Sequence, residues 1–381
     1  MTPPAMTGAF VYGKLPPMNP INVGLVGVGN CASSLVQGLA HYANGGANEA
    51  IGLMHWNLGG YRPSDIRISA AWDIDARKVG KPVGKAIFEK PNCTAIFCDH
   101  GIADGAIVEM GQLLDGVSEH MDEASVDRSF SVADLPQPSQ DDVVRRLEET
   151  ETQVLMNYLP VGSQQATEFY AECALKAGTA FVNNIPVFIA SDEQWAKRFS
   201  DAGVPLIGDD IKAQLGATIV HRVLTDLFAK RGVRLDRTYQ LNTGGNTDFL
   251  NMTNRARLKS KKTSKTEAVQ SVAERRLDNE NIHVGPSDYV AWQNDNKVCF
   301  LRMEGRLFGG VPMNLELRLS VEDSPNSAGV AIDLIRCARI ARDRGIGGPI
   351  LQPSAAFCKH PPQQVTDDEA HHALEQFIAG A

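Results

Sequence analysis

The sequence predicts an α/β protein whose parallel sheet is doubly wound and is interrupted by a smaller α+β domain. Three observations lead to this prediction. A β-rich run near the amino terminus ends in a glycine turn and continues as a helix, strand-like and helix-like runs then alternate, and a later region changes to regular apolar and polar alternation. With 381 residues and 43% hydrophobic content, the chain is long enough for two structural units.

The first expected strand and helix are joined by a turn of the dinucleotide-binding type. Residues 21–28, INVGLVGV, form a β-rich run, and residues 27–32 at its end fit the spacing GxGxxA before a helical segment. The start of that helix would present free N–H groups to a pyrophosphate. We therefore expect a Rossmann-like NAD site at Gly27, Gly29, Asn30 and Cys31. A tight strand-to-helix turn that binds nothing is the alternative.

The second expected strand, residues 67–76, carries Asp73 and Asp75 near its carboxyl end. An acidic side chain there can hydrogen-bond a ribose hydroxyl, which favours NAD over NADP. Asp73 is the stronger candidate because it closes the apolar run. Its distance from Gly29 exceeds the usual spacing of about 20 residues, so the segment before the strand is expected to be an inserted loop.

Strand-like runs then alternate with helical ones, as crossover connections in a parallel sheet require. The expected strands are 154–163, 180–186 and 204–210. Ligands of such sheets bind beyond the carboxyl ends of the strands. Five polar residues should therefore lie at one rim: Asn157, Asn183, Asn184, Asp209 and Asp210. Turn capping is the alternative role for the asparagines.

The region from residue 237 to 323 has a different pattern. Its alternating runs, KVCFLRMEGRLFG and PMNLELRLSVED, predict an antiparallel sheet with one exposed face. Ser324 and Pro325 are suitable first residues for the helix that follows. The expected limits are a leader at 1–19, the first part of the NAD-binding domain at 20–236, a catalytic and oligomerisation domain at 237–323, and a return to the first domain at 324–381.

A basic segment, SKKTSK at residues 260–265, stands out in a chain of formal net charge −8. Ser264 and Glu267 fit a capping box before an expected helix, which would place Lys265 in the first helical turn. A cation there opposes the helix dipole, so its position indicates that an anion shares the site, and Lys261 could converge on the same anion. A phosphorylated small molecule fits such a compact cluster. A lysine-rich loop in solvent is the alternative.

Composition and cysteine spacing argue against several classes of function. The acidic balance disfavours extended nucleic-acid binding, which needs a basic face. Seven cysteines without CxxC spacing disfavour a disulfide framework and a structural zinc site. No apolar run approaches the roughly 20 residues that span a bilayer, and the amino-terminal segment lacks the pattern of a secretion signal. We therefore expect a cytoplasmic protein without a membrane or nucleic-acid partner.

Several long stretches, spread over residues from about 20 to 375, carry a family resemblance. They are VGVGNCASSLVQG, NYLPVGS, GDDIKAQLGAT, LNTGGNTDFLNM, SKKTSK, DSPNSAGVAID, RDRGIGGP and CKHPP. In these stretches the chain resembles the myo-inositol-1-phosphate synthases of the short bacterial type. The resemblance implies a homotetramer, assembled through the sheets of the second domain, that converts glucose 6-phosphate to inositol 1-phosphate (also numbered 3-phosphate).

The implied reaction uses NAD that is regenerated in every cycle. Its steps are oxidation at C5, enolisation, intramolecular aldol cyclisation and re-reduction. Positioned ammonium groups suit this chemistry because every step develops or moves negative charge on oxygen. Some members of the family also use a monovalent or divalent metal ion, although no cluster in this sequence defines its ligands.

The resemblance also implies roles for individual residues. Lys359, in CKHPP, resembles a catalytic lysine that relays the proton of the C5 oxygen. Lys261 and Lys265 would serve the phosphate, the oxyanions or the nicotinamide end of the cofactor. The implied catalytic residues are Lys261, Lys265, Lys297, Lys359, Asp210 and Asp323. The further implied cofactor contacts are Tyr170, Asp210, Lys212, Ala213, Asp248 and Lys261.

Two other functions are compatible with parts of this pattern. A dehydrogenase of a sugar phosphate would share the fold and release NADH, and fold alone does not separate it from the synthase. A non-enzymatic NAD-dependent sensor or scaffold would bind the same ligands without turnover. The joint presence of the expected catalytic lysines and aspartates disfavours this last function.

Overall fold

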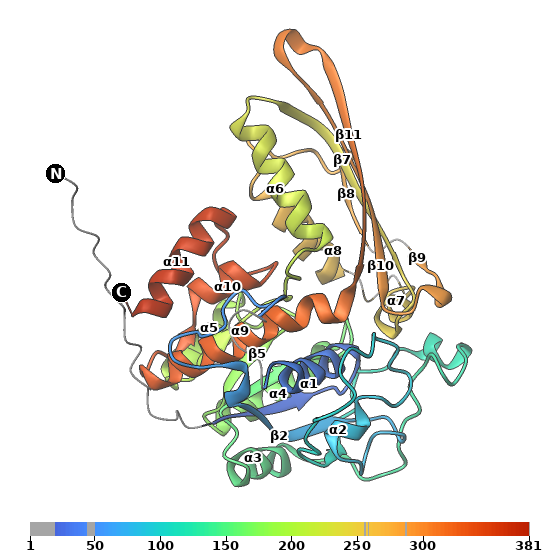
Figure 1. The fold of residues 1–381 in the computed structure, drawn as a ribbon, viewed down its shortest axis with the longest axis vertical. Helices are drawn as coiled ribbons and strands as arrows, with labels where there is room; N and C mark the ends of the chain where they lie inside the picture. The colour runs from blue at the N-terminus through green and yellow to red at the C-terminus, as the bar shows by residue number, and fades with distance from the viewer. Residues whose placement is uncertain (1–19, 44–49, 255–256, 258, 286–287, 381) are drawn as a thin grey trace, which may run out of the picture.

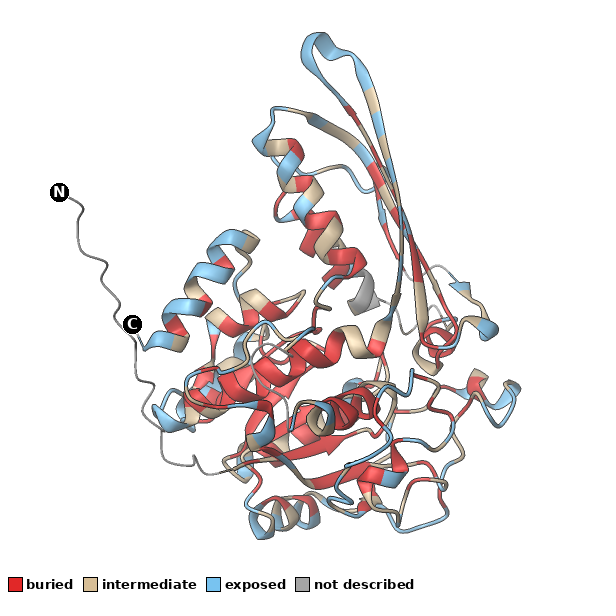
Figure 2. Cartoon of the chain, viewed as in Figure 1, coloured by how far each residue is buried: buried red, intermediate tan, exposed pale blue. Residues whose placement is uncertain are grey.

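The computed structural model describes residues 20–43, 50–254, 257, 259–285 and 288–380, except for the side chains of Lys259, Lys261 and Lys262. The expected leader lies outside the described residues. Figure 1 shows a layered α/β body and a tall second sheet that projects from it. The inner strands and helices of the body are buried, as Figure 2 shows.

The larger sheet has seven strands, all parallel, in the order β12-β6-β5-β4-β1-β2-β3. Its strands are β1 (Ile21–Val26), β2 (Ile66–Asp73), β3 (Val108–Met110), β4 (Val154–Asn157), β5 (Ala180–Asn183), β6 (Pro205–Ile207) and β12 (Gly348–Pro349). The part β3-β2-β1-β4-β5-β6 is the strand order of dinucleotide-binding sheets. The predicted fold class is therefore confirmed, and the order reverses between β1 and β4, where ligands of such sheets bind.

Helices cover both faces of this sheet because its strands are apolar on both sides. Along β4, Val154 and Met156 pack into one core and Leu155 into the other. The first core is covered by α1 (Asn30–Tyr42), α9 (Asp323–Asp343), α10 (Leu351–Phe357) and α11 (Asp367–Ala379). The second core is covered by α3 (Gln140–Glu149), α4 (Gln164–Lys176) and α5 (Glu193–Asp201). A short helix, α2 (Val83–Ala86), follows β2.

The second sheet has five strands and is mixed. Its strands are β7 (Arg234–Gly244), β8 (Ile282–Val284), β9 (Asp288–Tyr289), β10 (Asn296–Arg306) and β11 (Pro312–Glu322). β10 pairs antiparallel with β7 and β11, as predicted. The antiparallel prediction is wrong for β8 and β9, which pair parallel with β7. The chain crosses over through α7 (Thr247–Asn251) and α8 (Lys259–Gln270) before β8, and such a crossover returns a strand in parallel.

Two helices connect the second sheet to the body. α6 (Ala217–Lys230) leads into β7, and its apolar side packs with Cys299, Leu301 and Met303 of β10. α9 begins directly after β11 and packs against α1 and against strands of the larger sheet. Both helices therefore bring residues of the second sheet to the edge of the first. In the part of the chain that the structure describes, no helix is both long and apolar enough to cross a membrane.

An ion-pair cluster fixes the long loop that precedes β2. His55 Nδ1 lies 2.5 Å from Asp333 Oδ2 on α9, and His55 Nε2 lies 2.9 Å from Glu375 Oε1 on α11. The hydrogen bond to Asp333 raises the pKa of His55 above its ordinary value, against a smaller opposing effect of burial. The expected inserted loop is thus attached to two helices of the body.

This cluster predicts a pH-dependent stability. Because the folded-state pKa of His55 is raised, its proton stabilises the fold fully below the unfolded pKa of about 6.5, and the contribution is lost as pH rises through the folded pKa. We expect the difference in unfolding free energy between the wild type and His55→Ala to shrink as pH rises from below about 6.5 through the folded-state pKa of His55. Denaturant unfolding at several pH values measures it. A difference that stays constant would exclude this role of His55.

Candidate active site

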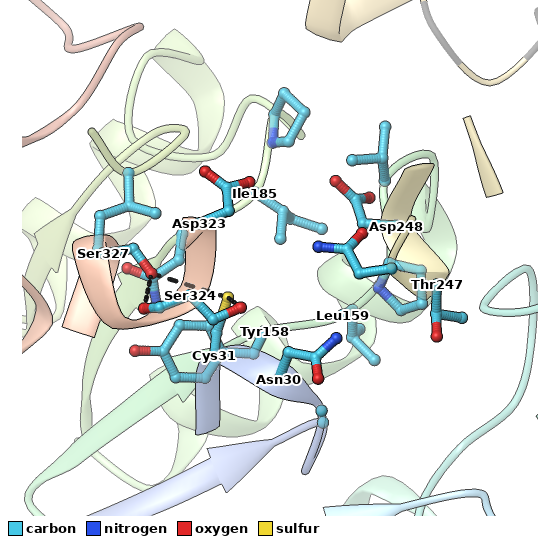
Figure 3. A pocket seen from close by; sticks show the side chains of 18 of the residues that line it. Asn30, Cys31, Tyr158, Leu159, Ile185, Thr247, Asp248, Asp323, Ser324 and Ser327 are labelled. Atoms are coloured by element: carbon cyan, nitrogen blue, oxygen red, sulfur yellow. Dashed lines mark hydrogen bonds between the residues drawn. The ribbon is translucent and has the colours of Figure 1, made fainter. Parts of the chain in front are cut away.

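One cavity lies beyond the carboxyl ends of β1 and β4 and extends to the base of the second sheet. Figure 3 shows Asn30 and Cys31 of α1 on one side, with Thr247 and Asp248 of α7 and Asp323 of α9 around the same space. The cavity is therefore built from both parts of the molecule. The sequence-predicted residues that line it are Gly27, Gly29, Asn30, Cys31, Asp73, Tyr170, Asp210, Ala213, Asp248, Lys265, Lys297, Asp323 and Lys359.

The glycine turn has the shape and the donors that a pyrophosphate needs. Gly27 has φ +91°, and a Cβ there would lie 2.8 Å from the carbonyl oxygen of Tyr158. A Cβ at Gly29 would meet no atom within 4 Å, so this side of the turn is open. Gly29 is the N-cap of α1, no side chain caps it, and the first turn holds no acidic residue. The free N–H groups and the open space fit a dinucleotide pyrophosphate.

Asp73 ends β2 beside this turn and faces the cavity. Its carboxylate accepts the N–H of Val28 at 2.7 Å and the N–H of Asp75 at 2.9 Å. The alternative acid, Asp75, is buried, and its carboxylate accepts hydrogen bonds from Arg77 Nε at 2.7 Å and Ser131 N–H at 3.0 Å. Asp73 therefore keeps lone pairs on the cavity side that suit a ribose hydroxyl.

Asn30 and Cys31 begin α1 and have structural partners at the cavity edge. Asn30 Oδ1 accepts the N–H groups of Cys93 at 2.7 Å and Thr94 at 3.0 Å, which holds the loop after α2 beside the turn. Burial raises the pKa of the Cys31 thiol to about 12. The thiol therefore stays protonated at neutral pH and forms a neutral part of the wall.

The other expected cofactor contacts differ in what they present to the cavity. Tyr170 is buried, and its hydroxyl accepts a backbone N–H at 2.9 Å. Ala213 lines the cavity, whereas Lys212 Nζ donates to the carbonyl oxygens of Ala355 at 2.8 Å and Ala356 at 3.2 Å. Burial lowers the pKa of Lys212 to about 8. A cofactor contact at Lys212 would therefore have to come from its backbone.

Asp210 and Lys359 form an ion pair in the cavity wall. Lys359 Nζ lies 2.8 Å from Asp210 Oδ1 and donates to the carbonyl oxygen of Ile211 at 2.6 Å. The other carboxylate oxygen of Asp210 accepts the Ser264 hydroxyl of α8 at 2.7 Å. Asp210 thus connects the segment that carries Lys359 to the helix that carries the basic segment.

Lys297 and Asp323 form a second ion pair, at the base of the second sheet. Lys297 Nζ lies 3.0 Å from Asp323 Oδ1. Burial lowers the pKa of Lys297, but the charge of Asp323, its hydrogen bond and the nearby charge of Asp248 outweigh burial and raise the pKa above its ordinary value. Lys297 is therefore an ammonium at neutral pH, suited to stabilising an oxyanion rather than to abstracting a proton.

Helix α8 differs from the sequence prediction. The capping box at Ser264 is wrong, because the helix begins at Lys259 and Ser264 lies inside it, where its hydroxyl donates to Asp210. The helix ends at Gln270. Lys265 is consequently not in the first turn; it is buried and lines the cavity. The expected catalytic and cofactor role of Lys261 falls on a side chain that lies outside the described residues.

The expected polar rim is mostly a buried support for the site. Asn157 Nδ2 donates to Asn183 Oδ1 at 2.9 Å, and Asn183 Nδ2 donates to Asp209 Oδ1 at 2.6 Å. Asp209 also accepts three backbone N–H groups, those of residues 189–191, so it fixes the turn that precedes Asp210. Asn184 lines the cavity, and its buried Oδ1 has no hydrogen-bond partner in the described structure.

The start of α6 is a part of the cavity that sequence reasoning missed. Its first residues, 216–219, line the cavity. Gly216 is the N-cap, no side chain caps the helix, and no acidic residue lies in its first turn. The free N–H groups of such a helix start favour an anion. The signal in the sequence was a glycine followed by an acid-free helical start, but nothing local to it indicated that it would face the lysines.

Metal ligands were left undefined by the sequence. Within the described part of the chain, no three His, Cys, Asp or Glu side chains come together as a group that could hold a metal ion. In the ion pairs Lys297–Asp323 and Lys359–Asp210 of the cavity, the carboxylates are bound by lysines instead. The described residues therefore give no donor set on which a metal-dependent step can be based.

A doubly wound sheet with an open glycine turn, next to a cavity lined by lysines and aspartates from several segments, defines a dinucleotide-binding enzyme of the Rossmann class. Comparison with known proteins gives the family. The family model for myo-inositol-1-phosphate synthase matches residues 216–324. Inositol-3-phosphate synthase of Mycolicibacterium smegmatis is 54% identical over 94% of this chain and 98% of its own length.

A second relative gives the same family, and a solved structure shows the same fold. Inositol-3-phosphate synthase of Corynebacterium glutamicum is 51% identical over 95% of this chain and 99% of its own. The crystal structure of a myo-inositol-1-phosphate synthase-related protein from Thermotoga maritima shares the fold, with a TM-score of 0.76 over 95% of this chain and 99% of that chain at 23% identity. The chain belongs to the myo-inositol-1-phosphate synthase family.

Proposed function

We propose that the protein converts D-glucose 6-phosphate to 1D-myo-inositol 3-phosphate with NAD that is regenerated in each cycle. The observation that carries this proposal is a single cavity that joins an open glycine turn to Lys265, Lys297 and Lys359. A cofactor site and several oxyanion-stabilising groups in one cavity suit a reaction that oxidises, enolises and cyclises one bound sugar phosphate. The inositol-3-phosphate synthase name of relatives near half identity supports it.

The cofactor would lie along the glycine turn. The start of α1 fits the pyrophosphate, and Asp73 fits a ribose hydroxyl. When bound, NAD supplies the oxidation at C5 of the open-chain sugar and its reversal after ring closure. Asp248 and Asp323 line the cavity on the side of the second sheet, so the reacting carbons would lie between them and the turn.

The residues of the chain would handle the charges and protons. Lys359, hydrogen-bonded to Asp210, would relay the proton of the C5 hydroxyl: its ammonium would pass a proton to the Asp210 carboxylate as it accepts the hydroxyl proton, and the transfer would reverse when the carbonyl is reduced. Lys297 would stabilise the enolate oxygen as a permanent cation. Lys265 and the start of α6 would hold the phosphate, because both line the same cavity and both favour an anion. A metal ion, expected from the resemblance for some members, is given no role in these steps.

An assay with limiting cofactor tests the function. The protein is incubated with glucose 6-phosphate and with much less NAD than glucose 6-phosphate. The formation of inositol phosphate and the absorbance of NADH are followed. We expect many turnovers per NAD without net NADH. Accumulation of NADH in proportion to substrate would instead establish the sugar-phosphate dehydrogenase. Binding without turnover would point to the sensor.

We also propose that copies of the chain assemble through the outer face of the second sheet, as a homotetramer. The β10–β11 hairpin projects beyond the body, and β11 forms a sheet edge (Figures 1 and 2). Phe300 and its cross-strand neighbour Leu241 are exposed apolar residues of this sheet. Such a patch on a long sheet is typical of a protein–protein contact.

This assembly gives a prediction for Phe300→Asp. Burial of an apolar side chain in the contact stabilises it by about 1.5–3 kcal/mol. Replacing Phe300 with a carboxylate removes this contribution and should raise the dissociation constant of the assembly at least about tenfold. Light scattering at fixed concentration measures the change in mass. Ile96→Asp, at an exposed apolar residue of the body, is the matched control and should leave the mass unchanged. Equal masses for the wild type and Phe300→Asp would contradict assembly through this face.

A further inference from the structure

Behind the cavity, two buried cations share one carboxylate. Arg222 on α6 is 1% exposed and Lys212 is 2% exposed. Arg222 Nε lies 3.0 Å from Asp367 Oδ2, and Lys212 Nζ lies 3.5 Å from Asp367 Oδ1. Neither cation lines the cavity, and one carboxylate does not balance two positive charges. Their remaining hydrogen bonds go to the ends of two helices and to the segment that follows Lys359.

Arg222 holds the end of α8. Its guanidinium donates to the carbonyl oxygen of Ala268 at 2.6 Å and to the Ser271 hydroxyl at 2.9 Å. Ala268 lies in the last turn of α8, where unpaired carbonyl groups and the helix dipole both favour a cation. Lys265 lies one turn earlier on the same helix. The guanidinium therefore fixes the position from which Lys265 enters the cavity.

The same guanidinium holds the segment that follows Lys359. It donates to the carbonyl oxygen of Val365 at 2.9 Å and approaches Gln364 Oε1 at 3.5 Å. Gln364 Nε2 in turn donates to the carbonyl oxygen of Lys359 at 2.7 Å. Arg222 is thus connected by hydrogen bonds to the helix that carries Lys265 and, through Gln364, to the backbone of Lys359.

Lys212 holds the helix that precedes Lys359. The carbonyl oxygens that it binds, those of Ala355 and Ala356, belong to the last turn of α10. α10 ends at Phe357, two residues before Lys359. A buried ammonium at this helix end stabilises the carbonyl groups and fixes the direction in which the chain leaves the helix.

We propose that Arg222, Lys212 and Asp367 form a positioning layer that holds Lys265 and Lys359 around Asp210 and thereby sets the turnover number. This inference rests on the proposed function. The two lysine-bearing segments already meet at Asp210, which accepts Ser264 of α8 at 2.7 Å and Lys359 at 2.8 Å. A displacement of about 1 Å in such an arrangement can reduce a rate by about a hundredfold.

The test replaces Arg222 with lysine. An ammonium keeps the charge but cannot reproduce the planar set of donors that serves α8, Val365 and Asp367 together. We expect the turnover number to fall about tenfold to a hundredfold. The dissociation constant of NAD should change by less than about twofold, because the glycine turn is untouched. Steady-state kinetics with glucose 6-phosphate measure the turnover number, and a separate titration measures the dissociation constant of NAD.

Arg336→Lys is the matched control. Arg336 is 0% exposed, forms a buried ion pair with Asp333, and donates to carbonyl oxygens of the loop before β2, away from the cavity. Both substitutions should lower the thermal unfolding midpoint, but only Arg222→Lys should lower the turnover number. Equal fractional losses of turnover in the two variants would overturn the positioning role.

A second variant keeps the test decisive if Arg222→Lys does not fold. Asp367 is only partly buried, with a side chain 31% exposed, so Asp367→Asn should fold. Its turnover number should also fall, with NAD affinity kept, because both cations lose their shared carboxylate. Unchanged turnover in Asp367→Asn would overturn the inference. An inactive wild type would instead overturn the proposed function, so the two failures are distinguishable.

Discussion

Replacing Lys359 with alanine is expected to reduce turnover about a thousandfold while leaving NAD binding within about twofold of the wild type. The Lys359 ammonium is bound by Asp210 and the carbonyl oxygen of Ile211, and it lines the cavity. It is therefore placed to exchange a proton with a bound sugar, and general acid–base groups contribute on this scale. Because its contacts do not include the glycine turn, the cofactor should bind almost normally.

Lys230→Ala is a control from the same chain. Lys230 lies at the exposed end of α6 and pairs with Asp226 and Asp368, far from the residues that line the cavity. Its loss should leave turnover unchanged. Turnover and tryptophan-based or calorimetric NAD titration should be measured on both variants. Near-normal activity of Lys359→Ala would show that the proton transfer is assigned to the wrong lysine.

Lys297→Met should reduce turnover nearly as much as Lys359→Ala, for a different physical reason. The methionine keeps most of the side-chain volume but removes the charge that Asp323 binds at 3.0 Å. Loss of one preorganised group that stabilises an oxyanion costs about a hundredfold to a thousandfold in turnover. The variant should also be less stable, because the Asp323 carboxylate loses its lysine in a partly buried site.

A double variant separates these two effects. In Lys297→Met with Asp323→Asn, no carboxylate is left without its cation, so part of the lost stability should return. Turnover should stay low because the cation is still absent. Chemical unfolding and steady-state kinetics on the two single variants and the double variant form one cycle. Recovery of turnover in the double variant would mean that Lys297 serves only to neutralise Asp323.

The sequence predicted those features of the fold that are local. The glycine turn after β1 and the acid that ends β2 follow from short patterns, and the parallel direction of the strands in the body follows from alternating runs and crossover connections. The polar residues at the carboxyl ends of β4, β5 and β6 were also expected at one rim. The sequence could not show which of them support the turn before Asp210 and which face the cavity. The reason is that Asn183 and Asp209 form hydrogen bonds between neighbouring strands.

The features that sequence reasoning missed depend on contacts between distant segments. Ser264 fitted a capping box locally, but its hydroxyl binds Asp210, 54 positions earlier, and the helix starts before it. The second sheet is mixed because the chain crosses over through α7 and α8 before β8 pairs with β7. No short pattern in the sequence shows that the strand after this crossover returns to β7. Arg222 had no motif at all, because its partners belong to α8 and to the segment before α11.

The measurement that tests the central claim most directly uses glucose 6-phosphate deuterated at C5. If the cavity oxidises that carbon, closes the ring and reduces the same carbon again, the hydride is returned within one cycle. Mass spectrometry of the inositol phosphate should then show the deuterium retained on the product, and unlabelled NAD in the medium should stay unlabelled. Product without deuterium, with the label found in free NADH, would contradict a closed redox cycle in this cavity.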